Sequence, residues 1–234
     1  AAATWMRGVD FIQIPTTLLA CVDSSVGGKT GINIAEGKNL VGAFHSPKLV
    51  IIDSETLESL PKREFNAGMS EIVKHALLFD EKLLEIIENH YNKKEKLDID
   101  YILKRNCELK SHIVQIDYKE KKERMFLNFG HTIGHSVENA SGYGVLLHGE
   151  AVAIGMIFAI EYGIKLGITK NKNILERVKN ILSNIGLPIN IPENINLKEA
   201  IKLDKKRNNE KINFVFLEDI GKPIIEKVDI NSIM

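Results

Sequence analysis

The chain has 234 residues, and its 31 Lys and Arg residues balance its 31 Asp and Glu residues, so its formal net charge is zero. Hydrophobic residues make up 44% and charged residues 26%, a globular composition that excludes a disordered, collagen-like or disulfide-stabilised protein. Zero net charge also argues against a nucleic acid or a membrane surface as the partner. Two cysteines, Cys21 and Cys107, indicate a reducing, cytoplasmic compartment, and no apolar run is long enough to predict a transmembrane helix.

The first 60 residues predict short strands and glycine-rich turns. Residues 1–6 are typical of the interior of a helix, without an initiator Met or a signal-peptide pattern, so we expect the chain to be part of a longer natural protein. Residues 11–14 and 49–52 are predicted strands. Between them, residues 23–33 contain too much glycine for a regular core element, and residues 37–39 are predicted to form a hairpin turn.

After Pro61, apolar residues recur at helical spacing. The predicted helices cover residues 64–79, 83–91, 99–116, 126–137, 151–166 and 174–185, and Gly186 is expected to end the last of them. Two strands, 212–217 and 224–228, are predicted on either side of a turn at 220–223. The sequence thus predicts an α+β chain that is mostly helical, with a β-containing N-terminal edge.

Three histidines form a candidate metal site. His131 and His135 are four residues apart in a helical pattern, so their rings project from one face, where they can share a metal ion. Gly130 and Gly134 leave room for another group to approach that helix. His148 lies just before the next helix. The competing interpretation, a hydrogen-bonded core residue, is the better one for a single histidine but not for three beside two glycines.

A carboxylate would complete a catalytic zinc site of three protein ligands and one open position. Glu71 is the candidate, because it lies in a helix whose apolar side would otherwise bury it. Lys74, three residues later, offers an ion pair as the competing explanation. Spacing alone leaves the two alternatives equally open.

Polar residues upstream of His131 suggest an anionic substrate. Arg124, Asn128, His131 and His135 follow one another at steps of four, three and four, so in a continuous helix they share one face. Such a polar row among apolar neighbours is unfavourable unless a polar ligand lies against it, and Arg binds carboxylates through two parallel hydrogen bonds. Lys110, in the preceding predicted helix, is a second candidate cation.

Residues 27–30, Gly-Gly-Lys-Thr, match only part of the P-loop that binds nucleoside triphosphates. That motif requires Gly five positions before Gly28, where this chain has Asp23, so we exclude a P-loop nucleotide triphosphatase. Lys29, Lys38 and Asn39, together with the backbone N–H groups of the glycine-rich segment, still suit a phosphate group.

Taken in order, these motifs resemble 3-dehydroquinate synthase, a family of sugar-phosphate cyclases in the shikimate pathway. The resemblance covers Arg7-Gly8 and residues 15–20, 22–30, 37–39, 60–64, 68–74, 127–135, 148–151, 204–206 and 220–221. Cys21 departs from it, because the family usually has Gln there. The resemblance implies a Rossmann-like α/β lobe with a glycine-rich dinucleotide motif, followed by a helical metal-binding lobe. Residues 1–60 would be a remnant of the first lobe, with the phosphate and cofactor loops, and residues 61–234 the helical metal- and substrate-binding domain.

The resemblance also implies roles for individual residues. Zinc, or cobalt or another divalent metal, would be bound by Glu71, His131 and His148. The catalytic residues would be His135, Lys74, Lys110, Arg124, Asn128 and Asp23. The substrate phosphate would be bound by Lys29, Asn39 and Lys205 or Lys206, and by Arg7 of a neighbouring subunit in a homodimer. NAD would lie near Thr16, Thr17, Asp23, Lys29, Lys38, Ser59 and Leu60.

The implied activity is that of a lyase of aromatic amino acid biosynthesis, which converts 3-deoxy-D-arabino-heptulosonate 7-phosphate to 3-dehydroquinate and phosphate. NAD+ would take up and return a hydride, and zinc would polarise the reacting alcohol. Since the chain resembles only the part after the dinucleotide motif, we expect it to bind metal but to be inactive alone. One alternative is another sugar-phosphate cyclase, such as a 2-deoxy-scyllo-inosose synthase; the other is a non-catalytic helical module stabilised by a metal. Arg124, Asn128 and Lys110 suit a substrate carboxylate, which glucose 6-phosphate, the inosose synthase substrate, lacks. We therefore favour the dehydroquinate synthase activity over both alternatives.

Overall fold

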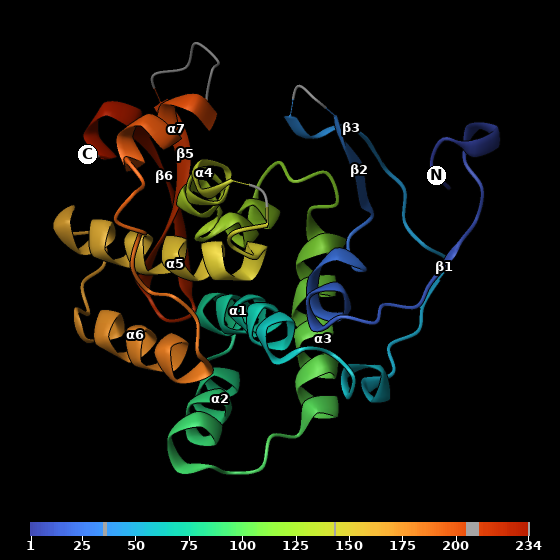
Figure 1. Ribbon diagram of the computed structural model, residues 1–234, viewed down its shortest axis with the longest axis horizontal. Coiled ribbons are helices and arrows are strands. Elements are labelled where there is room, and N and C mark those ends of the chain that lie inside the picture. The colour runs from blue at the N-terminus through green and yellow to red at the C-terminus, as the bar shows by residue number, and fades with distance from the viewer. Residues whose placement is uncertain (35–36, 143, 205–210, 234) are drawn as a thin grey trace.

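The computed structural model describes residues 1–34, 37–142, 144–204 and 211–233, with the backbone alone for 37–38 and 202–204 (Figure 1). The helices are α1 (Lys62–Phe79), α2 (Glu81–Lys93), α3 (Ile99–Ile116), α4 (His131–Ser141), α5 (His148–Lys165), α6 (Asn173–Ile185) and α7 (Leu197–Asp204). The strands are β1 (Ile12–Gln13), β2 (Lys29–Ile34), β3 (Gly37–Phe44), β4 (Leu49–Val50), β5 (Lys211–Asp219) and β6 (Lys222–Asp229). Helices predominate, which confirms the predicted α+β class.

The described strands pair as three separate two-stranded sheets. β1 and β4 are parallel, whereas β2 with β3 and β5 with β6 are antiparallel. The glycine-rich segment therefore does contain a regular element, since β2 begins at Lys29 and pairs it with Phe44 of β3. Residues 37–39 begin β3 rather than forming the hairpin turn. The last turn is also shorter than predicted, because only Ile220 and Gly221 separate β5 from β6.

Side chains near the helix ends explain where several helices begin. At the start of α2, Asp80 accepts a hydrogen bond from the N–H of Leu83 at 3.1 Å, and at the start of α3 Asp98 accepts one from Tyr101 at 3.0 Å. Gly186 ends α6 in the left-handed region, at φ 90°, as predicted. These local signals explain why most helix bounds fall within a few residues of the prediction.

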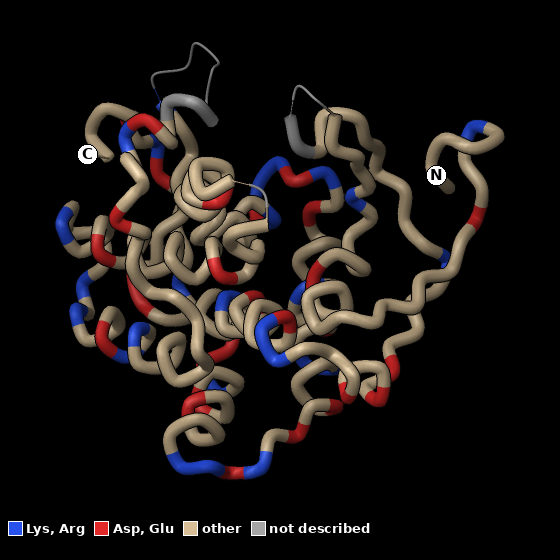
Figure 2. The backbone as a smooth tube through the Cα atoms, in the orientation of Figure 1, with Lys and Arg blue, Asp and Glu red and all other residues tan. Residues whose placement is uncertain are grey.

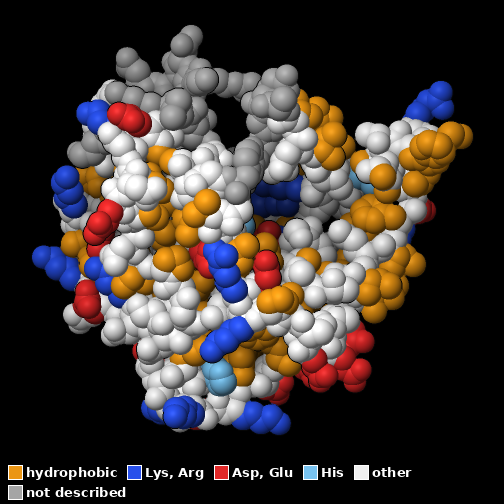
Figure 3. All heavy atoms as spheres, in the orientation of Figure 1, with side chains coloured by type: hydrophobic (Ala, Val, Ile, Leu, Met, Phe, Trp, Pro, Cys, Tyr) orange, Lys and Arg blue, Asp and Glu red, His pale blue; other side chains and the backbone are white. Residues whose placement is uncertain are grey.

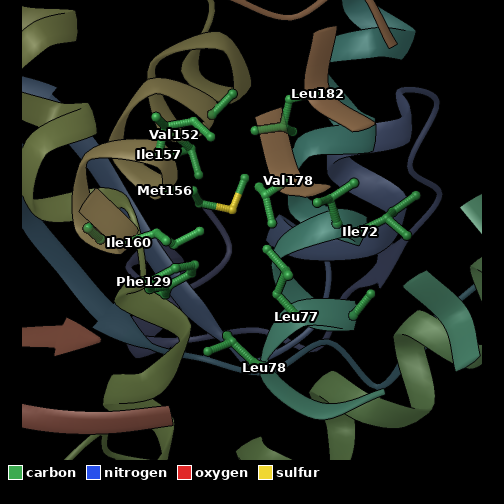
Figure 4. Close-up of a cluster of buried hydrophobic side chains, with 14 of the residues drawn as sticks. Ile72, Leu77, Leu78, Phe129, Val152, Met156, Ile157, Ile160, Val178 and Leu182 are labelled. Atoms are coloured by element: carbon green, nitrogen blue, oxygen red, sulfur yellow. The ribbon is translucent and has the colours of Figure 1, made fainter. Parts of the chain in front are cut away.

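The hydrophobic core lies where α5 packs against α1, α4 and α6 (Figure 4). The side chains labelled in Figure 4 are at most 3% exposed: Ile72, Leu77, Leu78, Phe129, Val152, Met156, Ile157, Ile160, Val178 and Leu182. Burying each such side chain contributes roughly 1.5–3 kcal/mol. α5 is apolar around most of its circumference and is buried accordingly. Among the described helices, none is both long and apolar enough to cross a bilayer.

The molecule has a helical body and a β-rich edge, with α3 standing between them (Figure 1). The β2–β3 hairpin lies on the opposite side of α3 from α5. A hollow separates the hairpin from the helical body, and basic side chains lie at its floor (Figure 3).

Two predicted helices are wrong. Residues 126–137 are not one helix, because a 3-10 helix, Glu123–Asn128, ends before Phe129 and α4 begins only at His131. Gly130 takes the left-handed conformation between them, at φ 77°, which breaks the helical path. Residues 1–6 form turns and part of a 3-10 helix, Trp5–Arg7, in which no residue is buried. Short helices without tertiary packing are marginal, which explains this difference.

Candidate metal and anion site

Glu71, His131 and His148 come from three different helices and meet at one point. Glu71 lies in the middle of α1, whereas His131 and His148 are the first residues of α4 and α5. Oε1 of Glu71 is 3.7 Å from Nε2 of His131 and 3.9 Å from Nε2 of His148. His131, His135 and His148 each place one ring nitrogen within 4.8 Å of the others. The structure therefore brings together the predicted metal ligands and His135.

Glycines allow α4 and α5 to approach closely enough to bring these histidines together. A Cβ on Gly134 would lie 2.9 Å from the carbonyl oxygen of Ala151, and one on Gly155 would lie 1.9 Å from that of Gly130. The group that approaches the two glycines of the histidine helix is thus α5. Arg63 fixes the start of α5 by a two-pronged ion pair with Glu150, at 2.7 and 2.8 Å.

The carboxylate of Glu71 is completely buried, and neither of its oxygens accepts a hydrogen bond of good geometry. Oε2 forms an ion pair with the ammonium of Lys74, which is only 1% exposed. Oε1 instead faces the two histidine nitrogens. Glu71 can therefore be both a metal ligand and the ion-pair partner of Lys74, because Oε1 faces the histidines whereas Oε2 pairs with the ammonium.

The two histidines present suitable nitrogens to an ion. Nδ1 of His131 is 3.2 Å from the carbonyl oxygen of Phe129, and Nδ1 of His148 is 3.4 Å from Oε2 of Glu138. Both acceptors favour a proton on Nδ1, which leaves Nε2 with a lone pair toward Glu71. Burial and the nearby ammonium of Lys74 hold the pKa of His131 well below its ordinary value, so this ring is neutral at pH 7. Burial opposes protonation of His148, but its hydrogen bond to Glu138 and the negative charges of Glu71 and Glu138 together outweigh burial and raise its pKa.

Asp23 and Lys110 form a second charged pair beside Glu71. Nζ of Lys110 donates to Oδ1 of Asp23 at 2.6 Å and also bonds the Asp23 carbonyl oxygen. Burial would raise the pKa of Asp23, but the ammonium groups of Lys110 and Lys74 outweigh burial and hold the pKa below its ordinary value. The pair is therefore ionised, as contact with a substrate hydroxyl would require.

His75 and Asn106 belong to the same cluster but were not predicted from the sequence. Nδ1 of His75 is 2.8 Å from Oδ1 of Asn106, and both side chains are fully buried. Asp23, Glu71 and His75 each place one polar atom within 4.8 Å of the others. A histidine one turn after Glu71 in an apolar helix was the available signal, but its partner lies 31 residues away.

Lys29 and Asn128, predicted to contact the substrate, both bind Glu120. Nδ2 of Asn128 donates to Oε1 of Glu120 at 2.7 Å, and Lys29 forms an ion pair with Oε2. Glu120 lies in the loop after α3, where acidic and basic residues alternate (Figure 2). Glu120, which was also not predicted from the sequence, links the hairpin to the helical body.

Arg124 is buried at 3% exposure, but it does not share a helical face with the histidines. Its guanidinium donates to the carbonyl oxygens of Tyr118 at 2.6 Å and Gly27 at 2.8 Å. The predicted row of polar residues is wrong, because Arg124 and Asn128 belong to the 3-10 helix that ends before Gly130. Arg124 instead fixes the turn between Val26 and the hairpin.

The predicted phosphate residues are only partly brought together. Lys29 and Asn39 line one pocket on the β2–β3 hairpin. Arg7 is exposed in the N-terminal 3-10 helix, at the outer end of the molecule (Figure 1). The side chain of Lys38 and the residues Lys205 and Lys206 lie outside the described part of the chain.

Four of the residues predicted near NAD come from two adjoining segments, whereas Asp23 lies in the charged cluster with Lys110, and Lys29 begins β2. Thr16 and Thr17 precede a short π-helix, Ala20–Ser24, and Ser59 and Leu60 precede α1, which that π-helix contacts. Thr17 Oγ1 accepts a hydrogen bond from Ala20 at 3.2 Å. Thr16 and Ser59 are exposed. The structure thus places these four residues in segments that adjoin α1.

Comparison with known proteins gives the family. Residues 68–207 match the family model described as 3-dehydroquinate synthase C-terminal, and residues 1–67 match the one described as 3-dehydroquinate synthase N-terminal. The chain belongs to the 3-dehydroquinate synthase family. The domain boundary that we predicted between residues 60 and 61 stays a prediction.

Curated relatives carry the same family name. The 3-dehydroquinate synthase of Thermoanaerobacter pseudethanolicus is 48% identical over all of this chain and 67% of its own length. That of Prochlorococcus marinus strain MIT 9312 is 49% identical over 94% of this chain and 62% of its own length. The chain therefore spans about two thirds of the length of these members of the 3-dehydroquinate synthase family.

Solved structures of related cyclases have the same fold. A 2-deoxy-scyllo-inosose synthase complexed with carbaglucose-6-phosphate, NAD+ and Co2+ matches all of this chain and 67% of its own, at TM-score 0.88 and 29% identity. A 2-epi-5-epi-valiolone synthase from Streptomyces hygroscopicus, with NAD+ and Zn2+ bound, matches 99% of this chain at TM-score 0.87 and 28% identity. This chain has the fold of the helical lobe of the sugar-phosphate cyclases.

Proposed function

We propose that the chain carries the metal- and substrate-binding part of a 3-dehydroquinate synthase, which converts 3-deoxy-D-arabino-heptulosonate 7-phosphate to 3-dehydroquinate and phosphate. The buried carboxylate of Glu71 supports the proposal most directly. Its oxygens lack hydrogen bonds, and Oε1 faces Nε2 of His131 and of His148. A buried carboxylate in this state needs a positive partner, and Lys74 satisfies only the other oxygen.

A divalent metal, zinc or cobalt, fits this donor set. One carboxylate and two imidazoles leave an open position for substrate in a catalytic zinc site. His131 is neutral at pH 7 and His148 has a carboxylate behind it, as ligating histidines commonly do. Metal-bound relatives of the same fold support the assignment. When bound, the metal would polarise a substrate oxygen as a Lewis acid.

The remaining residues of the site orient the substrate. Asp23 and Lys110, which form an ionised pair, would accept from and donate to one substrate hydroxyl. Lys29 and Asn39 line one pocket and would hold the phosphate. His135 is exposed beside the two other histidines, where its ring can take up or release a proton at a substrate oxygen. Arg124 and Asn128 would meet the substrate carboxylate after exchanging their present partners, which include Glu120.

NAD is the proposed second cofactor, since the two solved relatives contain it. Of the described residues predicted to contact NAD, Thr16 and Ser59 are exposed, whereas Asp23 lies in the charged cluster beside Glu71. We therefore assign to this chain only one wall of a cofactor site. A homodimer in which Arg7 meets the partner's substrate phosphate also stays a prediction.

A second sugar-phosphate cyclase activity is the alternative, because the solved relatives are an inosose and a valiolone synthase. Sequence identity favours dehydroquinate synthase, at 48% and 49% against 28% and 29%. The two activities differ in whether the substrate carries a carboxylate. Glucose 6-phosphate is therefore the discriminating substrate.

The test measures phosphate release by a fusion in which the N-terminal third of a curated relative precedes this chain. With the heptulosonate phosphate, NAD+ and Zn2+ or Co2+, we expect turnover that requires NAD+ and stops when a chelator removes the metal. Glucose 6-phosphate should not be converted. The 234-residue chain alone should bind metal without turnover, since misplacing reacting groups by about 1 Å can reduce the rate on the order of a hundredfold. If the fusion converted glucose 6-phosphate but not the heptulosonate phosphate, the proposed substrate would be wrong.

A further inference from the structure

One buried polar atom has no part in the proposed function. Among the described residues, the buried side-chain nitrogens and oxygens without a hydrogen bond are both oxygens of Glu71 and Nε2 of His75. A metal and Lys74 account for the oxygens of Glu71. Nε2 of His75 is left, and such a group needs a partner because burial without one is unfavourable.

Asn106 determines what kind of partner His75 needs. Nδ2 of Asn106 donates to the carbonyl oxygen of Val22 at 2.9 Å, so Oδ1 of Asn106 is the atom that faces Nδ1 of His75. An amide oxygen only accepts, and Nδ1 of His75 must therefore carry the proton. Burial and the ammonium of Lys74 lower the pKa of His75 to about 4, so the ring is neutral at pH 7. Nε2 is then an acceptor that needs a donor.

The surroundings of His75 leave room for one small donor. Asp23, Glu71 and His75 each contribute one polar atom, and these atoms lie within 4.8 Å of one another. Nδ1 is occupied by Asn106, which leaves Nε2 as the nitrogen available to an occupant. For three atoms no more than 4.8 Å apart, a point exists that lies no farther than about 2.8 Å from each, within reach of a hydrogen bond.

Charge balance selects water over a cation. The carboxylates of Asp23 and Glu71 are already paired with the ammonium groups of Lys110 and Lys74. A divalent ion at this point would have one histidine ligand and would be repelled by both of these ammonium groups, whereas the proposed metal has two imidazole ligands besides Glu71. A water molecule can donate to Nε2 and to a carboxylate while accepting from an ammonium.

We propose that Asp23, Glu71 and His75 hold one buried water molecule, which donates to Nε2 of His75 and to a carboxylate oxygen. With its second proton on Glu71 and a hydrogen bond accepted from the ammonium of Lys110, this water would connect the proposed metal ligand with the Asp23–Lys110 pair. His75 is a positioning residue, kept in the required tautomer by Asn106. The water does not depend on the metal, whereas its effect on metal binding rests on the proposed function.

Two measurements on the unchanged chain test the water directly. A crystal structure that shows ordered solvent should contain one water within hydrogen-bond distance of Nε2 of His75 and of a carboxylate oxygen of Asp23 or Glu71. Long-range nitrogen–proton NMR of the histidine rings should show His75 protonated on Nδ1. An anomalous metal peak at that point, a direct bond from an ammonium to Nε2, or the Nε2–H tautomer would overturn the proposal.

Variants test whether the water orients Glu71. His75→Leu should weaken Co2+ binding by about 10- to 100-fold, as loss of an outer hydrogen-bond partner commonly does, and should change the visible Co2+ spectrum. His75→Gln keeps an acceptor and should retain most of the affinity. His112→Leu, at an exposed position of α3, is the matched control. Equal affinity in His75→Leu and wild type would overturn the positioning role. Absence of metal binding in the wild type would instead contradict the proposed function. The crystal structure and the histidine NMR would still show whether the water is present.

Discussion

Glu120 accepts a hydrogen bond from Nδ2 of Asn128 at 2.7 Å through a carboxylate that is also paired with Lys29. Lys29 and Asn128 are both predicted to bind anionic groups of the substrate. A carboxylate of the chain itself therefore occupies groups that the proposed substrate would need. The proposed substrate would have to replace these contacts, so we expect Glu120 to compete with anions for Lys29 and Asn128.

Replacing Glu120 by Gln should strengthen the binding of inorganic phosphate. The substitution removes the charge that pairs with Lys29 but preserves the size of the side chain. Lys29 is half exposed, at 48%, so the gain should be small, about two- to fivefold, as expected for an ion pair open to solvent. Calorimetric titration with phosphate at fixed ionic strength measures it. Glu193→Gln makes the same change of charge at an exposed position elsewhere, and an equal gain there would show a general charge effect.

Replacing Gly134 by Ala should destabilise the chain, although Ala usually favours a helix. The new Cβ would lie 2.9 Å from the carbonyl oxygen of Ala151 and 3.2 Å from Cα of Val152, so backbone atoms of α5 must move. Overpacking of this kind costs about 1–3 kcal/mol. Urea unfolding followed by circular dichroism measures the change. An unchanged or higher free energy of unfolding would mean that α4 and α5 separate freely.

Local patterns predicted most helices, because each depends on apolar spacing and capping residues within its own segment. The same spacing wrongly joined Phe126 to Val137. Phe126, Leu127 and Phe129 continue the apolar pattern, and only the left-handed conformation of Gly130 reveals the break. A glycine in sequence does not tell whether it adopts that conformation.

The site was predictable where a motif marks it and not where contacts are distant. The sequence predicted Glu71, His131 and His148 as a group, and the structure places them together. It did not predict His75 with Asn106, or Glu120 with Asn128, since these pairs form across turns and between helices. Their residue types are common on helices and loops, so only the packing of α1 against α3 identifies the first pair, and only the folded segment between α3 and α4 identifies the second.

Replacing His148 by Ala should remove the metal. One of three proposed ligands is lost, so affinity should fall by more than the roughly 10- to 100-fold typical of losing an outer partner. Elemental analysis after dialysis against trace Zn2+ measures metal content. His90→Ala, a half-buried histidine near the end of α2, should retain full content. Full retention in His148→Ala would contradict its assignment as a ligand.

Asp117 should make the loop that carries Glu120 sensitive to acid. Its carboxylate accepts hydrogen bonds from the N–H groups of Lys121 at 2.9 Å, Lys122 at 2.6 Å and Arg124 at 3.2 Å. These bonds, that of Lys121 foremost, hold the pKa of Asp117 below its ordinary value. The unfolded chain then binds the proton more readily than the folded chain, so this contribution to stability is present above about pH 4 and is lost as the pH falls through the lowered pKa.

Asp117→Asn removes that contribution, because an amide cannot replace a carboxylate that accepts three hydrogen bonds. The variant should be less stable than the wild type at pH 7 and pH 5, and the difference should shrink as the pH falls below 4. Urea unfolding at a series of pH values measures both curves. Asp10→Asn is the control, since its ion pair with Lys48 is exposed on both sides and such pairs contribute little. A difference between wild type and Asp117→Asn that stays constant from pH 7 to pH 3 would show that the charge of Asp117 does not hold the loop.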